Sequence, residues 1–233
     1  MNISTARKHA TKLAMPLCIA ALAAPAAQAA QAGFYVGGYY GEASKDVPIA
    51  IFDADAANVY ELIGFVPATR SARLDDETTT YGFQAGYRFN PHLAFEGGYM
   101  DLGSVAYREQ STGDWIDGPT TFQLNFDTRT TGFALSALGI LPLSYRFEVY
   151  ARGGVLLATN NYKLYLATPG LDPGRDEFSE TSTELLAGVG ASLSFLEIYG
   201  LRLEYQRVFD AGKASSGGAG DVDLMSLGIT VTF

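Results

Sequence analysis

Seven charged residues stand in segments where apolar residues occupy the alternate positions. They are three arginines and four glutamates: Arg88, Arg152, Arg202, Glu96, Glu148, Glu184 and Glu204. A charge taken out of water costs several kcal/mol unless it is paired or hydrogen-bonded. If the polar sides of these segments enclose a common interior, the seven residues predict an ion-pair network inside it.

The alternation predicts β-strands, because successive side chains of a strand point to opposite faces. It is clearest in residues 78–89, where Tyr81, Phe83 and Tyr87 share one parity and Gln84 and Arg88 share the other. Eight such segments are expected, at Phe34–Ala43, Thr78–Phe89, Leu93–Leu102, Phe126–Leu141, Phe147–Leu157, Thr181–Leu193, Ile198–Val208 and Asp223–Phe233. The first is aromatic on both parities, so its orientation stays open.

The connections between these segments alternate between short and long. Short ones fall at 90–92, 142–146 and 194–197, and long ones at 44–77, 103–125, 158–180 and 209–222. A meander with one plain end and one elaborate end is typical of an outer-membrane barrel, whose short turns lie in the periplasm. For the first long segment we expect either a short helix or an extension of the strands.

Lysine indicates which face of the strands points outward. Outside the N-terminal segment the chain has only Lys45, Lys163 and Lys213, all in predicted long connections. A water-exposed strand surface, as in a soluble barrel, usually carries lysine. The apolar face is therefore expected to contact lipid, and Gly, Ser, Thr and balanced charges to line a narrow lumen. The predicted fold class is all-β, an eight-stranded antiparallel up-and-down transmembrane β-barrel.

The first 29 residues predict a cleaved signal peptide. Arg7, Lys8 and Lys12 form a basic head, residues 13–24 an apolar core, and residues 27–29 the cleavage site Ala-Gln-Ala. We expect residues 30–233 to form the outer-membrane β-barrel domain. The single cysteine, Cys18, would leave with the signal, so disulfides are not expected.

Composition limits the classes of partner. The chain has 16 Lys and Arg against 25 Asp and Glu, a formal net charge of −9. Such an acidic chain is not expected to bind nucleic acid. Beyond the predicted signal, no segment offers about 20 uninterrupted apolar residues for a membrane-spanning helix. The predicted location is the bacterial outer membrane.

Alternating glycine and aromatic residues recur in several parts of the chain. These parts are Gly33–Gly38, Tyr81–Phe89, Leu93–Tyr99, Leu201–Tyr205 and the closing Gly228–Phe233. In order and spacing they resemble the OmpA-type, eight-stranded outer-membrane β-barrel family. The resemblance implies insertion by the barrel assembly machinery, which reads the C-terminal strand and its terminal aromatic residue. We expect no peptidoglycan-binding domain after Phe233, as in the barrel-only members of the family.

The charged network leaves two interpretations open. An eight-stranded barrel has little interior beyond its own side chains. The network therefore favours a plug of ion pairs, in a protein with long extracellular loops and a structural or surface-interaction role. The alternative is a gate, in which one arginine exchanges carboxylate partners and opens a narrow, porin-like channel for small solutes.

A lipid A-modifying enzyme is the third candidate class. Small outer-membrane barrels that act as enzymes generally use a histidine as general base near the outer leaflet. The only histidine after the predicted signal is His92, in a turn expected on the periplasmic side. We therefore predict no catalytic residue, no metal site and no cofactor.

Two arginines, Arg129 and Arg207, share the apolar parity near the long-connection ends of their strands. An outward arginine is tolerated near an interface, where its stem lies along lipid and its head reaches phosphate. We expect these residues either to contact lipopolysaccharide phosphates or to reach water and loop acids.

Outward aromatic residues gather at the short-turn ends and predict an interfacial girdle that anchors the barrel in lipid. They are Tyr87, Phe89, Phe95, Phe147 and Phe233. At the opposite end, exposed aromatic residues such as Trp115 would contact a surface ligand carried by the long loops. Alternatively, these loops pack on one another and only cap the barrel.

Overall fold

The computed structural model describes residues 32–233 apart from 117, 171, 196–197 and 212–219. The predicted signal peptide, residues 1–29, lies outside them. The described residues form one helix and nine strands. In chain order these are β1 Gly33–Asp46, α1 Ile49–Ile63, β2 Val66–Asp75, β3 Glu77–Asn90, β4 Leu93–Trp115, β5 Gly118–Pro142, β6 Phe147–Ala167, β7 Gly174–Phe195, β8 Tyr199–Val208 and β9 Asp221–Thr232.

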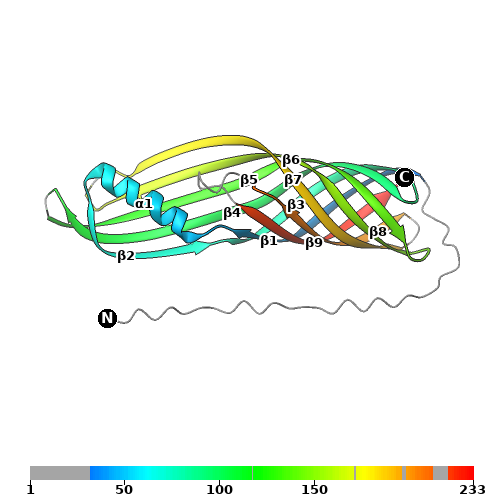
Figure 1. The fold of residues 1–233 in the computed structure, drawn as a ribbon, viewed down its shortest axis with the longest axis horizontal. Coiled ribbons are helices and arrows are strands. Elements are labelled where there is room, and N and C mark those ends of the chain that lie inside the picture. The colour runs from blue at the N-terminus through cyan, green and yellow to red at the C-terminus, as the bar shows by residue number, and fades with distance from the viewer. Residues whose placement is uncertain (1–31, 117, 171, 196–197, 212–219) are drawn as a thin grey trace.

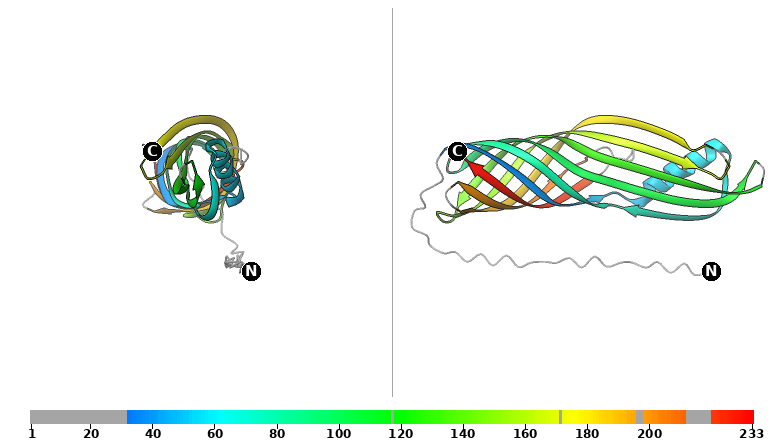
Figure 2. Two further views of the ribbon diagram at one scale, coloured as in Figure 1. Left: turned by 90° about the vertical axis from the view of Figure 1, so that its left-hand side faces the viewer. Right: turned by 180° about the vertical axis from the view of Figure 1, so that it is seen from behind.

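Eight of the strands close into a ring, which Figure 2 shows from the end. β1 pairs with β3 on one side and β9 on the other, while β4 pairs with β3 and β5. The strands from β5 to β9 follow one another in order, and every pairing is antiparallel. The predicted all-β, up-and-down barrel is confirmed.

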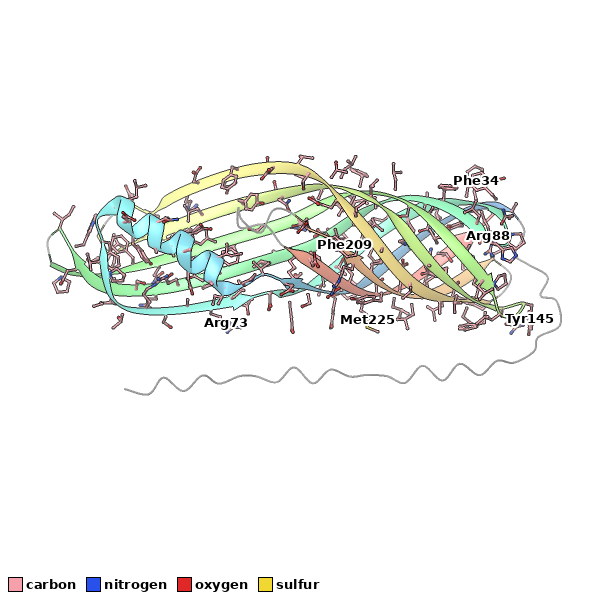
Figure 3. All side chains as sticks on the ribbon, in the orientation of Figure 1. Phe34, Arg73, Arg88, Tyr145, Phe209 and Met225 are labelled. Atoms are coloured by element: carbon pink, nitrogen blue, oxygen red, sulfur yellow. The ribbon has the colours of Figure 1, made fainter. Side chains whose placement is uncertain are left out.

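The outer surface of the ring is apolar. Phe83 and Phe133 are each 65% exposed. Figure 3 shows Phe34 and Met225 pointing away from the barrel. In β1, whose orientation the sequence left open, the even-numbered residues are the exposed ones and Tyr35 points into the lumen. This surface is suited to lipid contact, as the distribution of lysine predicted.

Four strands continue far beyond the ring. β4, β5, β6 and β7 have 23, 25, 21 and 22 residues and include most of 103–125 and 158–180. The prediction of long connections there was wrong. Both segments continue the antiparallel registers, with Tyr107 opposite Phe126 and Tyr162 opposite Phe178. Their outer face lies beyond the apolar surface of the ring and is polar. The apolar alternation that predicted the other strands is therefore weaker in these segments.

β2 and α1 join these long strands to form one unit. We call β2, α1 and residues 104–115, 118–129, 159–167 and 174–184 the extension. β2 pairs with β4 only, so the extension is an open sheet in the order β2, β4, β5, β6, β7. Residues 44–77 thus contain both structures that the sequence allowed, a helix and an added strand.

α1 lies against the inner face of the extension (Figure 1). Phe52, Ala56 and Tyr60 recur every four residues and are buried on one side of the helix. The helix ends at Gly64, whose φ of 70° is the left-handed conformation that glycine adopts at low cost. The buried cluster beneath it also includes Val105, Tyr107, Phe122 and Leu124. No helix among the described residues is long and apolar enough to cross a membrane.

A second apolar cluster fills the barrel where the ring meets the extension. We call it the apolar layer; it comprises Ala43, Met100, Leu102, Ala134, Leu156, Ala158, Leu186, Val208, Ala211, Val222 and Leu224. The lumen thus contains an apolar layer that the sequence did not predict, in addition to the expected small and charged residues. Lumen-facing residues change from charged to apolar along a strand, as from Arg152 to Leu156 in β6.

Candidate functional site

The centre of the predicted ion-pair network is Glu96, which is buried between two arginines. Arg152 Nη2 lies 2.5 Å from Glu96 Oε2, and Arg202 Nη1 lies 2.6 Å from Glu96 Oε1. Arg152 also donates through Nε to Glu204 Oε1 at 2.5 Å. Ring closure thus brings together side chains from β4, β6 and β8.

Two tyrosines complete this arrangement. The hydroxyl of Tyr35 donates to Glu96 Oε1 at 2.6 Å, and that of Tyr150 donates to Glu204 Oε2 at 2.8 Å. The guanidinium carbon of Arg202 lies 4.5 Å from the centre of the Tyr150 ring, within cation–π range. We call Tyr35, Glu96, Tyr150, Arg152, Arg202 and Glu204 the lumen cluster.

The sequence carried a signal for only one of these tyrosines. Tyr150 shares the polar parity of Glu148 and Arg152, so it could have been included with the charged residues. Tyr35 lies in the strand whose two parities are both aromatic, and only pairing with β3 and β9 orients it.

The other three predicted residues are not members of the lumen cluster. Arg88 and Glu148 form their own pair near the short turns, with Nη1 and Oε2 at 2.9 Å, and Arg88 also donates to the Pro91 carbonyl at 2.6 Å. Glu184 lies opposite Leu156, four residues from the position opposite Arg152. Glu184 therefore lies at the same height in the barrel as the apolar layer, and its place in the ion-pair network stays a prediction.

Arg129 and Arg207 point outward near the end of the apolar surface that adjoins the extension, and both pair with aspartates. Arg129 hydrogen-bonds to Asp101. Arg207 donates to both carboxylate oxygens of Asp223 at 2.6 Å. The two arginine side chains are 57% and 41% exposed, so each keeps N–H groups open to its surroundings.

The predicted girdle residues lie at the short-turn end of the ring. The ring centres of Tyr87 and Phe89 are 4.8 Å apart, and those of Phe89 and Phe95 are 5.5 Å apart. Phe147 and Phe233 are exposed. The arrangement forms a contiguous aromatic surface over β3 and β4, suited to the lipid interface.

A second polar cluster, which sequence reasoning missed, joins α1 and β2 to β4. We call Asp53, Arg70, Tyr107, Glu109 and Ser111 the extension cluster. Glu109 accepts from Arg70 Nε at 2.7 Å and Nη2 at 2.8 Å, from Ser111 Oγ at 2.5 Å and from the Tyr107 hydroxyl at 2.6 Å. That hydroxyl also lies 2.7 Å from Asp53 Oδ1. Tyr107, Glu109 and Ser111 are alternate residues of β4, but Asp53 comes from α1 and Arg70 from β2, so no local motif contains the whole cluster.

The charge on Glu109 is stabilised where it lies. Burial opposes its ionisation, but the hydrogen bonds from Arg70, Ser111 and Tyr107 outweigh burial and hold the pKa of Glu109 below its ordinary value. Its carboxylate therefore fastens β2 to β4 beneath α1 at neutral pH.

Lys45 was expected in a long connection, but it lies in β1 and its side chain is buried. The apolar surface of β1 ends at Tyr40, and Lys45 points inward beyond that level. Its Nζ donates to the Gly103 carbonyl at 3.0 Å. Burial lowers the pKa of Lys45 to about 7, although nearby Asp101 acts in the opposite direction.

Trp115 and His92 each contact a main-chain carbonyl. Trp115 Nε1 donates to the Ile63 carbonyl at 2.8 Å, and its ring meets Phe122 edge-on at 5.3 Å. His92 lies in the turn after β3, with Nδ1 at 3.1 Å from the Ile140 carbonyl. Across the part of the chain that the structure describes, no group of three or more His, Cys, Asp or Glu side chains could hold a metal ion.

Removal of Arg202 should strongly destabilise the barrel, because it leaves Glu96 buried with one cation fewer. We expect Arg202→Ala to lower the free energy of unfolding by about 3–5 kcal/mol. Urea unfolding in detergent micelles measures this. Arg73→Ala is the matched control and should change little, since Arg73 is 76% exposed and its one ion-pair partner among the described residues is Asp75. Equal effects of the two substitutions would contradict this account of the lumen cluster.

Acid should loosen the extension through Glu109. A carboxylate whose folded pKa is lowered stabilises the fold fully above its ordinary pKa of about 4.5, and loses that contribution as pH falls through the lower folded value. Trp115, the single tryptophan, reports on the extension by fluorescence. The urea midpoint of the wild type should fall between about pH 5 and about pH 3, and that of Glu109→Gln should change less. The exposed Glu61→Gln should behave like the wild type; a wild-type pH dependence in Glu109→Gln would exclude the assignment.

Comparison with known proteins agrees with this fold. The OmpA-like transmembrane domain family matches residues 29–233. Outer membrane protein A of Yersinia pseudotuberculosis is 30% identical over 151 residues, which are 64% of this chain and 38% of that protein. Outer membrane protein P5 of Haemophilus influenzae is 31% identical over 138 residues, 58% of this chain and 36% of that protein. The chain thus spans less than half the length of these curated relatives.

Solved structures with a similar fold include Neisserial surface protein A. It is 18% identical, with 86% of this chain and 97% of that chain covered and a TM-score of 0.49. The N-terminal β-barrel domain of Pseudomonas aeruginosa OprF is 13% identical, with coverages of 87% and 100% and a TM-score of 0.42. The protein is located in the bacterial outer membrane, where its apolar surface contacts lipid. It belongs to the OmpA-like transmembrane domain family.

Proposed function

We propose that this barrel is closed and displays the extension outside the cell, in a structural or surface-interaction role. One observation carries the proposal, namely the contrast between the two halves of the molecule. The ring holds two successive layers of packed side chains, whereas the extension projects beyond the apolar surface with its own core. Such a molecule is suited to contact with other molecules and poorly suited to transport.

Packing of the lumen supports closure. The lumen cluster spans the barrel with hydrogen bonds of 2.5–2.8 Å between β1, β4, β6 and β8. The cavity beside it, lined by Tyr39, Gln84 and Gln206 among others, has a volume of only about 10 Å³, roughly the space of one water molecule. The apolar layer follows directly, with Leu102, Leu156 and Leu224 fully buried.

One observation favours the alternative of a narrow channel. Arg152 contacts both Glu96 and Glu204, so it has two carboxylate partners to exchange. The apolar layer opposes this reading, because an exchange within the lumen cluster leaves its leucines unmoved. Closure therefore remains the function that the geometry supports best.

The proposed function does not include catalysis, since His92 is the one histidine among the described residues and lies in a short turn. The barrel assembly machinery recognises β9 and Phe233, which is 80% exposed.

Arg129 and Arg207 contact lipopolysaccharide phosphates through the N–H groups that their aspartates leave open. Their exposure where the apolar surface meets the extension supports this contact.

Planar bilayer recording tests closure. The wild type should give no stepwise conductance, and Arg152→Ala alone should also stay closed, because the apolar layer still excludes water. Arg152→Ala combined with Leu102→Ser and Leu156→Ser should conduct. Wild-type steps would support the channel instead, and steps from Arg152→Ala alone would show that the apolar layer does not seal the lumen.

Labelling of intact cells tests the display of the extension. Ile116 is 80% exposed at the far end of the extension, and Tyr145 is 70% exposed at the short-turn end, as Figure 3 shows for Tyr145. A membrane-impermeant maleimide should label Ile116→Cys on intact cells but Tyr145→Cys only after lysis. The reverse pattern would overturn the proposed orientation.

A further inference from the structure

One side of β7 is unpaired along the whole extension. Residues 174–184 pair with β6, but pairing with β8 begins only at Leu186. Among the described residues no other strand lies along this edge. Residues 174–181 are exposed throughout, so the edge is open to solvent.

The free edge presents a regular row of main-chain groups. The Phe209 N–H donates to the Leu185 carbonyl at 2.9 Å, so the main-chain groups of Leu185 point away from β6. In an antiparallel strand both groups of every second residue point the same way. Glu177, Ser179, Thr181 and Thr183 therefore direct their N–H and C=O groups toward the open side.

Residues 174–184 lack several of the devices that protect a sheet edge. Natural sheets shield exposed edges with charged side chains, lysine above all, and with proline or a β-bulge. The charges of this segment are one arginine and four acids, which repel another acidic strand but not a cationic one. The segment contains neither lysine nor proline, and its register with β6 runs without a shift from Gly174 to Leu193. β2, the other edge of the extension, differs, because it carries Pro67 and a register shift between Pro67 and Thr69.

The inward-facing side chains of residues 174–184 determine which added strand could pair with this edge. Asp176, Phe178 and Glu180 share the inward parity of Leu186. The Phe178 ring is stacked on Tyr162 with centres 4.7 Å apart, yet 57% of Phe178 is exposed. No ion pair joins Asp176 or Glu180 to another described residue. A strand added here would place its inward side chains beside an acid, an aromatic ring and an acid in turn.

We propose that residues 174–184 bind an extended cationic peptide by strand addition. Main-chain hydrogen bonds to Glu177, Ser179, Thr181 and Thr183 hold the peptide, and alternate side chains in the order basic, apolar, basic meet the inward row. A second copy of the chain is a poorer occupant. Its complementary edge is β2, whose Arg70 is already bonded to Glu109, and α1 lies between the two edges in Figure 1. The biological role of this site rests on the proposed display of the extension.

A synthetic peptide tests the proposal directly. The probe is a fluorescent heptapeptide, T-K-T-F-T-K-T, added at low salt to the protein in phosphatidylcholine nanodiscs, with binding measured by anisotropy. The wild type should bind it. Asp176→Asn combined with Glu180→Gln should weaken binding about tenfold, because rim charges contribute to such contacts. Glu61→Gln, which removes one exposed acid of α1 outside the proposed site, should stay within about twofold of the wild type.

Two further measurements test the main-chain contacts. Ser179→Pro removes a donor on the free side without touching the bonds to β6, and it should abolish binding. A probe N-methylated at alternate residues needs no protein variant and should also fail to bind. The proposal is overturned if the wild type does not bind, if T-E-T-F-T-E-T binds equally well, or if the N-methylated probe keeps its affinity. Both faces of a nanodisc are open to the peptide, so binding does not depend on which end of the protein faces outward in cells. Failure of the proposed display would instead be seen in the cell-surface labelling at Ile116.

Discussion

The pairing of β1 with β9 is the constraint on which the rest of the structure depends. It runs over twelve register positions, from Tyr35 opposite Thr232 to Asp46 opposite Asp221. Hydrocarbon offers no water to bond the N–H and C=O groups of an unpaired strand, and each unsatisfied group costs several kcal/mol. Joining the first strand to the last removes both edges, so the chain crosses the membrane only as a closed ring.

Closure also determines what the interior can contain. With eight strands the opposite walls are near enough for side chains to meet across the lumen. Glu96 and Arg202 lie 106 residues apart in sequence, yet their charged atoms are 2.6 Å apart. Because water is scarce there, each charge must find its partner within the protein. The tyrosines of the lumen cluster supply hydrogen bonds that the arginines alone would leave unmade.

The extension lies outside the hydrocarbon, where strand edges need not be paired within the protein. Beyond the apolar surface water can bond to strand edges, so the sheet can open and β2 and β7 can remain edges. The inner face still needs cover, and α1 supplies it with Phe52 and Tyr60. The molecule therefore consists of a closed half adapted to lipid and an open half adapted to water. The free edge of β7 exists only because of that change of solvent.

The sequence by itself determined that strands form, which of their faces meets lipid and which charged residues face the lumen, because side-chain direction alternates locally with a period of two. It also carried the turns at 90–92 and 142–146 and the absence of lysine from the apolar surface. Only the tertiary structure decided that Glu96 lies between Arg152 and Arg202, that Glu184 lies opposite Leu156, and that most of residues 103–125 and 158–180 continue as strands. Those outcomes depend on register and ring closure, which bring together residues far apart in the chain, and no local pattern encodes such distances.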